Sequence, residues 1–301
     1  MIFFIIGLFI ILSFFQIKYL FHSNFQPQIS LSCQEGELAI YLKKLKERVK
    51  TDLKDRVPEE FIETLFCSSK LTYLPEIMNK SLTWRETALP YHQFLEESRL
   101  KRAKEFIEQN RELLKKIENF FDVEKETLVA IFLVETDLGK NTGNYNVFNV
   151  FLSLALSGER ELYEKFINPP HLSLEDELIK KRWERRSNWG YRELLYLIEI
   201  AYKNHWDPFS LKGSIFGAFG YPQFVPRSYV IYGYDWNGDG KIDLYEIQDA
   251  LASIANYLQK EGYKRELSYE GKKKIIMKYN ISEPYAKTIL AIVDKLKNES
   301  Y

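Results

Sequence analysis

The central stretch LVAIFLVETDLG, residues 128–139, carries the strongest structural signal in the chain. Seven apolar residues precede Glu135, and no other charge interrupts them. A carboxyl group in such surroundings is desolvated, which should raise its pKa and suit it to act as a general acid at neutral pH. We therefore take Glu135 as the candidate catalytic residue. The alternative, that it is a solvent-facing helix residue, is left open at this point.

The pattern of apolar residues is helical over most of the chain, and strand-like alternation is almost absent. Asp122 is a plausible N-cap for the central helix, with Glu124 and Glu126 in its first turn, and we expect this helix to reach Leu138. Other helices are predicted from Glu37, from Pro58 and over residues 92–121, 146–157, 173–186, 190–204, 245–262 and 283–298. The sequence thus predicts a mainly α protein in which any sheet is small and local.

Composition bounds the class of protein. The 301 residues contain 46% hydrophobic residues and equal numbers of basic and acidic side chains, 42 each. This is typical of a folded globular protein, and the balanced charge predicts no nucleic-acid partner. Aromatic residues reach 15%, which suits a sugar-binding cleft, although most rings are expected in the core. The chain lacks a Walker A loop, a G-x-S-x-G motif and an H-E-x-x-H motif.

The N-terminal segment is distinct from the rest. Residues 1–21 are interpreted as a signal peptide or an N-terminal membrane anchor, because residues 2–15 form an apolar run broken only by a Gly and a Ser. Residues 22–35 read as a linker, and residues 36–301 as one domain with a charged surface insertion at about 168–188. Cys33 and Cys67 could pair or stay unpaired, and Cys33 stands in a poor match to a lipidation site.

A second informative stretch is KGSIFGAFGYPQFVP, residues 212–226. Its glycines, prolines and aromatic residues do not fit a regular element. They predict a shaped wall in which the backbone can approach a ligand closely, with Ser214 and Gln223 as hydrogen-bonding groups. A glycine-rich turn between helices is the alternative.

The third stretch, DWNGDGKIDLYE at residues 235–246, has the spacing of an EF-hand calcium loop. Oxygen ligands stand at loop positions 1, 3, 5, 9 and 12, a glycine at position 6 allows the turn, and position 7 would ligate through its carbonyl. The predicted ligands are Asp235, Asn237, Asp239, Lys241, Asp243 and Glu246. A single loop favours a structural Ca²⁺ over signalling.

Together, these motifs resemble the membrane-bound lytic murein transglycosylase B family, from about Trp84 to Leu296. The Val-Glu-Thr-x-x-Gly context of the family's catalytic Glu is matched at residues 134–139, and its Lys-Gly-Ser…Gln-Phe-x-Pro signature at 212–226. A calcium loop, an Ala-Asn-Tyr at 255–257 and a Tyr-Asn-x-Ser-x-x-Tyr-Ala at 279–286 follow in the same order. The resemblance implies a lysozyme-like α+β catalytic domain over residues 36–301.

The resemblance also implies a deep glycan groove. The positions that match residues lining it are Ser214, Gln223, Phe224, Tyr257, Tyr279, Asn280 and, after a gap, Tyr91. There are departures from the family pattern: Phe219 replaces a usual Met, Arg227 a common Ser, and Glu159-Arg160 a pair of arginines directed at the peptide stem. Recognition of the stem is therefore not implied.

The implied reaction needs one acid. Hydrolytic glycosidases use two carboxylates, about 5–5.5 Å or 6.5–9.5 Å apart, and Asp137 should point to a different helix face from Glu135. The family cleaves the bond between N-acetylmuramic acid and N-acetylglucosamine in peptidoglycan and closes a 1,6-anhydro ring. The expected setting is the periplasmic side of the cell envelope, where other cell-wall enzymes could be partners and only the N-terminus would meet the membrane. A lysozyme-type hydrolase and a non-catalytic peptidoglycan-binding protein are the alternatives.

Overall fold

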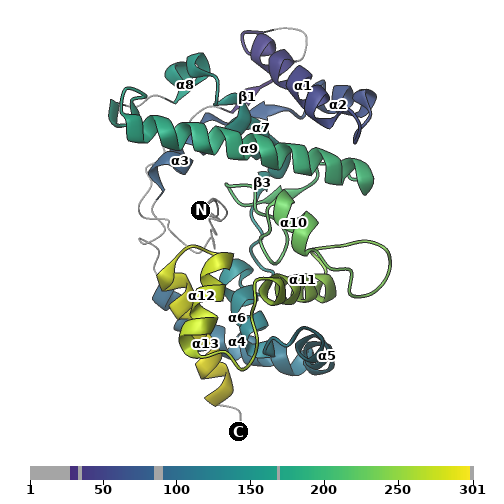
Figure 1. Ribbon diagram of the computed structural model, residues 1–301, viewed down its shortest axis with the longest axis vertical. Helices are drawn as coiled ribbons and strands as arrows, with labels where there is room; N and C mark the ends of the chain where they lie inside the picture. Colours follow the sequence, from purple (N-terminus) through teal and green to yellow (C-terminus); the bar gives the residue numbers. More distant parts are fainter. Residues whose placement is uncertain (1–27, 33–35, 85–90, 168–169, 299–301) are drawn as a thin grey trace. The chain divides into compact units, whose positions relative to one another are not determined.

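The computed structural model describes residues 28–32, 36–84, 91–167 and 170–298 (Figure 1). Their elements divide between two compact units, each built from two separate stretches of the chain. Of the described residues, the first unit comprises 91–143 and 218–298, and the second comprises those up to 84 and those from 144 to 217. The prediction of a mainly α protein is confirmed. In the described residues the strands form two pairs, and each strand is two residues long.

The first unit is helical. It contains the 3-10 helix η2 (Tyr91–Leu95) and the helices α4 (Glu97–Gln109), α5 (Arg111–Phe121), α6 (Lys125–Thr136), α10 (Pro226–Tyr232), α11 (Ile247–Lys260), α12 (Tyr269–Tyr279) and α13 (Glu283–Asn298). Helix α6 is its core, because every residue from Glu126 to Thr136 is buried. Helices α4, α5, α11 and α13 pack around it (Figure 1). This explains why its sequence is apolar on all faces.

The end of α6 differs from the prediction. The helix stops at Thr136 and does not reach Leu138, because Asp137, Leu138 and Gly139 all have positive φ angles. The amide of Leu138 donates to the carbonyl of Phe132, which closes the last turn. A Cβ on Gly139 would lie 3.0 Å from the ring of Tyr221, so the glycine allows the close approach of this ring as well as the turn.

The start of α6 also corrects a prediction. Asp122 is not its N-cap but the left-handed C-cap residue that follows α5, and its carboxylate pairs with Arg265 at 2.7 Å. Glu124 occupies the N-cap position, and its side chain turns away to bond with Tyr263 and Lys272. The predicted single helix over 92–121 is broken at Asn110, between α4 and α5.

The second unit combines helices with both short strand pairs. Its helices are α1 (Ala39–Leu53), α2 (Glu59–Phe66), α3 (Pro75–Thr83), α7 (Val147–Leu156), α8 (Arg160–Phe166), the 3-10 helix η3 (Pro170–Leu172) and α9 (Glu177–Lys203). Strand β1 (Ile29–Ser30) pairs with β2 (Thr72–Tyr73), and β3 (Tyr145–Asn146) with β4 (Lys212–Gly213), both antiparallel. Part of the predicted linker is therefore a strand.

Helix α9 is continuous, whereas two helices were predicted over 173–186 and 190–204. Helix α9 packs against α7 (Figure 1), and Gly190, at the start of the second predicted helix, lies in this contact. A Cβ at this position would come within 2.3 Å of Leu154 Cβ. The glycine thus permits close helix packing and does not end the helix. The charged stretch predicted to be a surface insertion contributes residues 177–188 to α9.

The N-terminal predictions fall largely outside the described residues. Residues 1–27 and Cys33 are among these, so the signal or anchor, the lipidation site and the pairing of Cys33 with Cys67 stay predictions. Within the described residues, none of the helices combines the length and the apolar character needed to span a membrane.

Candidate active site

Glu135 is the penultimate residue of α6 and is fully buried, with 0% of its surface exposed. Its Oε1 accepts a hydrogen bond of 2.6 Å from the hydroxyl of Tyr285 on α13. The alternative of a solvent-facing residue is therefore wrong. A buried carboxyl group held by a neutral donor is the arrangement expected of a catalytic acid.

Tyr285 was not among the predicted site residues, although it belongs to the motif at 279–286. Burial, together with the negative charge of Glu135, raises the pKa of Tyr285 well above its usual value. The phenol therefore stays protonated and can donate to Glu135 over the whole working pH range. The ring of Tyr91, on η2, lies 6.2 Å from that of Tyr285 in an edge-to-face contact, which brings this predicted residue next to the site.

Tyr279 is also close enough to Glu135 to sense its charge. Burial is the main reason why the pKa of Tyr279 lies well above its usual value, and the carboxylate of Glu135 adds to it. The Tyr279 hydroxyl donates to the carbonyl of Pro222 at 2.6 Å. Its ring lies 4.7 Å from that of Tyr257 and 6.0 Å from that of Phe224. Three predicted groove residues thus form one aromatic cluster beside Glu135.

Segment 218–226 is held by its own backbone. Phe219 and Phe224 exchange hydrogen bonds of 2.8 and 3.0 Å between their main chains. Gln223 has a φ of 50°. Its side-chain amide donates to the carbonyls of Gly220 at 2.8 Å and Thr142 at 3.2 Å. The side chain of Gln223 therefore stabilises the turn of segment 218–226. Asn280 is 1% exposed at the end of α12, where its carbonyl accepts from Ser282.

Asp137 does not complete a pair of catalytic carboxylates. Its left-handed backbone conformation turns it out of the helix, and its carboxylate binds Arg102 and lies 3.7 Å from Arg99, both on α4. The side chain of Asp137 is 3% exposed. A buried carboxylate neutralised by two guanidinium groups is poorly placed to activate water.

Ser214 belongs to the second unit, unlike the other predicted groove residues. It is 1% exposed, and its hydroxyl accepts from the amide of Phe216 at 3.3 Å. Glu159 and Arg160 lie in the same unit and are engaged in ion pairs, Glu159 with Lys44 and Arg160 with Glu164 and Glu175. That Ser214 lines the same groove as Gln223 stays a prediction.

The predicted calcium loop lies between α10 and α11. The amides of Gly238 and Gly240 donate to the carboxylate of Asp235, the amide of Asp239 to Asn237, and that of Lys241 to Asp239. These bonds fold the loop around its acidic side chains. Among the described residues, however, no group of three or more His, Cys, Asp or Glu side chains is gathered as metal ligands.

Asp249, which the sequence reading missed, closes the base of this loop. It is 1% exposed, and its two oxygens accept from the amides of Trp236 and Asp243, each at 2.9 Å. Asp249 thereby joins the two halves of the loop. The sequence offered one signal for this role, an acidic residue at the third position of α11.

The sequence matches the transglycosylase SLT domain family over residues 42–272, and the chain belongs to this family. Over 158 residues it is 30% identical to the membrane-bound lytic murein transglycosylase B of Escherichia coli (strain K12). This alignment covers 52% of the chain but only 37% of the relative's length. The family assignment confirms the resemblance read from the motifs.

Solved structures share the fold. The soluble lytic transglycosylase SltB1 of Pseudomonas aeruginosa superposes with a TM-score of 0.68 at 22% identity, covering 84% of this chain and 98% of that one. The Escherichia coli lytic transglycosylase Slt35, in complex with calcium, gives 0.66 at 19% identity, with coverages of 89% and 96%. SltB3 of Pseudomonas aeruginosa, in complex with NAG-NAM-pentapeptide, gives 0.67 at 18%, with coverages of 86% and 80%.

Proposed function

We propose that this protein is a lytic transglycosylase that cleaves the β-1,4 bond between N-acetylmuramic acid and N-acetylglucosamine in peptidoglycan. The observation that carries the proposal is the fully buried Glu135 with Tyr285 as its donor, next to an Asp137 that is bound by arginines. A single catalytic acid suits a reaction in which the substrate supplies the nucleophile. Family membership and the ligands of SltB3, which include NAG-anhNAM-pentapeptide, support it.

In the proposed mechanism, protonated Glu135 gives its proton to the glycosidic oxygen as the bond from this oxygen to C1 of the muramoyl residue breaks. The carboxylate so formed then takes the proton of the muramoyl 6-hydroxyl while this oxygen bonds to C1. The products are a 1,6-anhydromuramoyl end and a free 4-hydroxyl, and no water is consumed. Tyr285 stabilises the carboxylate state between the two proton transfers.

The aromatic cluster is the proposed wall of the glycan site. Ring faces of Phe224, Tyr257 and Tyr279 offer apolar surface for sugar rings, and all three lie in the first unit with Glu135. Gln223, Asn280 and Tyr91 would complete this side, and Ser214 remains a predicted sugar-binding residue.

The residues of loop 235–246 fit a structural Ca²⁺. The donor set consists of hard oxygens, and Asp235 already accepts from the amide of Gly240, the turn glycine. Asp235, Asn237, Asp239, Asp243 and Glu246 would hold the ion through side chains, and Lys241 through its carbonyl. Such an ion would tie α10 to α11 and take no part in the chemistry.

The N-terminus is proposed to place the enzyme at the periplasmic side of the cell envelope. The apolar run of residues 2–15 is suited to export or anchoring. The related Escherichia coli enzyme is named as membrane-bound. Partners among other cell-wall enzymes are part of this proposal.

The test is mass spectrometry of purified peptidoglycan after digestion with the full-length protein, solubilised in mild detergent, beside its Glu135→Gln variant. Removal of residues 1–35 is avoided because it would delete strand β1. Anhydro-muropeptides from the parent and none from the variant would establish the proposal. Reducing ends would instead identify a lysozyme-type hydrolase, and no cleavage by either protein would favour a binding protein.

A further inference from the structure

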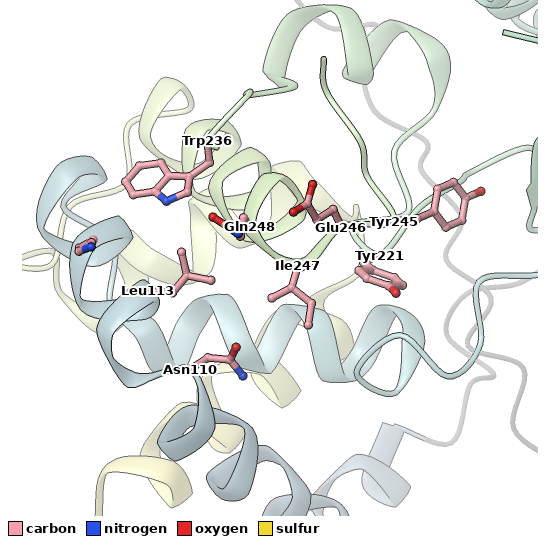
Figure 2. A pocket seen from close by; sticks show the side chains of 9 residues that line it. Asn110, Leu113, Tyr221, Trp236, Tyr245, Glu246, Ile247 and Gln248 are labelled. Atoms are coloured by element: carbon pink, nitrogen blue, oxygen red, sulfur yellow. The ribbon is translucent and has the colours of Figure 1, made fainter. Parts of the chain in front are cut away.

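A pocket of 630 Å³ lies in the first unit, between helix α5 and the end of loop 235–246 (Figure 2). Helix α5 and the residue before it contribute Asn110, Leu113 and Lys116, which are spaced three residues apart and so share one helix face. The opposite side is formed by Trp236, Tyr221 and residues 245–248. A pocket of this size falls within the usual range of ligand sites, about 300–1,000 Å³.

This pocket is separate from the candidate active site. Glu135 and the aromatic cluster of Phe224, Tyr257 and Tyr279 do not line it. Tyr221 lies between the two sites, since its ring lines the pocket while its carbonyl accepts from the Thr136 hydroxyl at 3.4 Å. A ligand in the pocket would therefore lie on the side of segment 218–226 that faces the calcium loop.

The chemistry of the walls selects for a neutral, polar ligand with an apolar face. Lys116 and Glu246 cancel in charge, and Asn110 and Gln248 supply neutral amides. Figure 2 shows the rings of Trp236 and Tyr221 toward opposite ends, with Leu113 and Ile247 between them.

The ring of Trp236 is fixed by neighbouring aromatic rings. Its indole is half-exposed, yet it packs against Phe120, Phe121 and Tyr234, with ring centroids 5.6, 6.1 and 6.1 Å away. A ring fixed in this way loses little conformational entropy when a ligand stacks on it.

We propose that this pocket is a second saccharide-binding site that takes an N-acetylhexosamine unit by stacking on Trp236 and hydrogen bonding to the amides of Asn110 and Gln248. That the natural ligand is a peptidoglycan strand rests on the proposed function. The presence of a saccharide site does not. In that setting the pocket would hold a neighbouring stretch of glycan while Glu135 acts elsewhere on the strand.

The probe is chitotetraose, the tetramer of N-acetylglucosamine, titrated by calorimetry at constant Ca²⁺ into the full-length protein carrying Glu135→Gln, which prevents cleavage. The same titration is made after adding Trp236→Ala, or Leu113→Arg, which places a long side chain in the pocket from α5 and leaves loop 235–246 unaltered. Tyr269→Ala is the matched control, because Tyr269 is an aromatic residue of the same unit that is 49% exposed and does not line the pocket.

We expect both pocket variants to lose one saccharide site, or to weaken it at least tenfold, whereas Tyr269→Ala binds like the parent. Equal stoichiometry and affinity in all four proteins would overturn the proposal, as would binding of a stem pentapeptide but not of chitotetraose at this pocket. The readout is a difference between variants and needs no cleavage. Failure of the proposed enzymatic function would appear separately, as the absence of anhydro-muropeptides.

Discussion

The hydroxyl of Tyr285 donates to Oε1 of Glu135 across 150 positions of sequence, and this bond joins helix α13 to the end of helix α6. Both side chains are fully buried, so the bond has no competition from water. It makes the C-terminal helix a part of the candidate active site. The state of Glu135 therefore depends on a segment that carries no predicted catalytic residue.

Tyr285→Phe should reduce kcat by about 10- to 100-fold, because a hydrogen bond to a charged group contributes about 1.5–3 kcal/mol. Without the donor the carboxylate form of Glu135 is less favourable, and its protonated form persists to higher pH. The alkaline limb of the pH–activity profile should therefore move upward. Anhydro-muropeptide release across pH measures both effects.

Tyr279→Phe is the control for this prediction. It also removes a buried phenol near Glu135, but that hydroxyl donates to the carbonyl of Pro222. Its activity should fall only through the lost hydrogen bond to Pro222, since Phe keeps the ring, and its pH profile should keep the parental shape. An equal shift in both variants would show that Tyr285 has no specific effect on Glu135.

Asp137→Asn should preserve the chemistry and weaken the fold. The substitution removes the carboxylate that binds the partly exposed Arg102 and one of the two carboxylates near the buried Arg99, which should cost about 1–3 kcal/mol of unfolding free energy. The products should remain 1,6-anhydro ends. Urea denaturation and muropeptide mass spectrometry test the two halves of this prediction. Complete loss of activity in a folded variant would instead give Asp137 a direct role.

Glu124 should cause part of the loss of folding stability at low pH. Burial disfavours its charge, but hydrogen bonds from Lys272 and Tyr263 outweigh burial and lower its pKa in the folded protein. A lowered folded pKa stabilises the protein above the unfolded value of about 4.5, and this contribution is lost as pH falls through the folded value. Glu124→Gln should lower stability at pH 7 by about 1–3 kcal/mol.

The variant should also lose less stability than the parent as the pH falls from above the unfolded pKa of about 4.5 to below it, for example from pH 5 to pH 3. Unfolding free energies at a series of pH values measure this difference. Glu266→Gln, at an exposed glutamate of the same unit, is the control. Parallel curves for parent and Glu124→Gln would exclude Glu124 as a source of the acid sensitivity.

Ca²⁺ should stabilise the parent through loop 235–246. A ligand that binds only the folded state at a hundred times its Kd adds about 2.7 kcal/mol, so Tm should rise on Ca²⁺ addition and fall with a chelator. Asp239→Asn should abolish most of the rise, since it removes a charged loop oxygen without touching Glu246, which lines the pocket. A Tm that does not respond to Ca²⁺ would contradict the proposed ion site and leave the hydrogen bonds to Asp235, Asn237, Asp239 and Asp249 as the contacts that order the loop.

The sequence predicted the helical class and the burial of Glu135 because both depend on local patterns of apolar residues. It mispredicted Asp122, because either the end of α5 or the start of α6 accommodates an Asp, and only tertiary partners such as Arg265 decide between them. The gap predicted between residues 186 and 190 was wrong for a related reason, since α9 runs through it without interruption. The close contact of Gly190 with Leu154 on α7 depends on tertiary packing, which the sequence does not show.

Contacts distant in sequence account for the rest of the site. The partners of Glu135 and Asp137 come from α13 and α4, and periodicity within one helix carries no information about which helix packs against it. The motif at residues 279–286 identified the segment that contains Tyr285, but it did not predict the hydrogen bond from Tyr285 to Glu135. Gln223 was predicted as a ligand contact, and its amide also holds the turn on which the wall depends.

Arg186→Met should stabilise the protein. Arg186, on α9, is only 6% exposed, and no carboxylate in the described part of the chain forms an ion pair with it. Burial, with Arg185 and Arg182 nearby, lowers its pKa to about 10, so at neutral pH the folded state holds an unfavourable charge. Met keeps the apolar stem that packs near Trp189 and removes this charge.

We expect Arg186→Met to gain about 1–3 kcal/mol of unfolding free energy, measured by urea denaturation. Arg185→Met, at an exposed neighbour, should change stability by less than about 0.5 kcal/mol. A loss of stability in Arg186→Met would mean that the guanidinium contributes more through its contact with Trp189 than its burial costs.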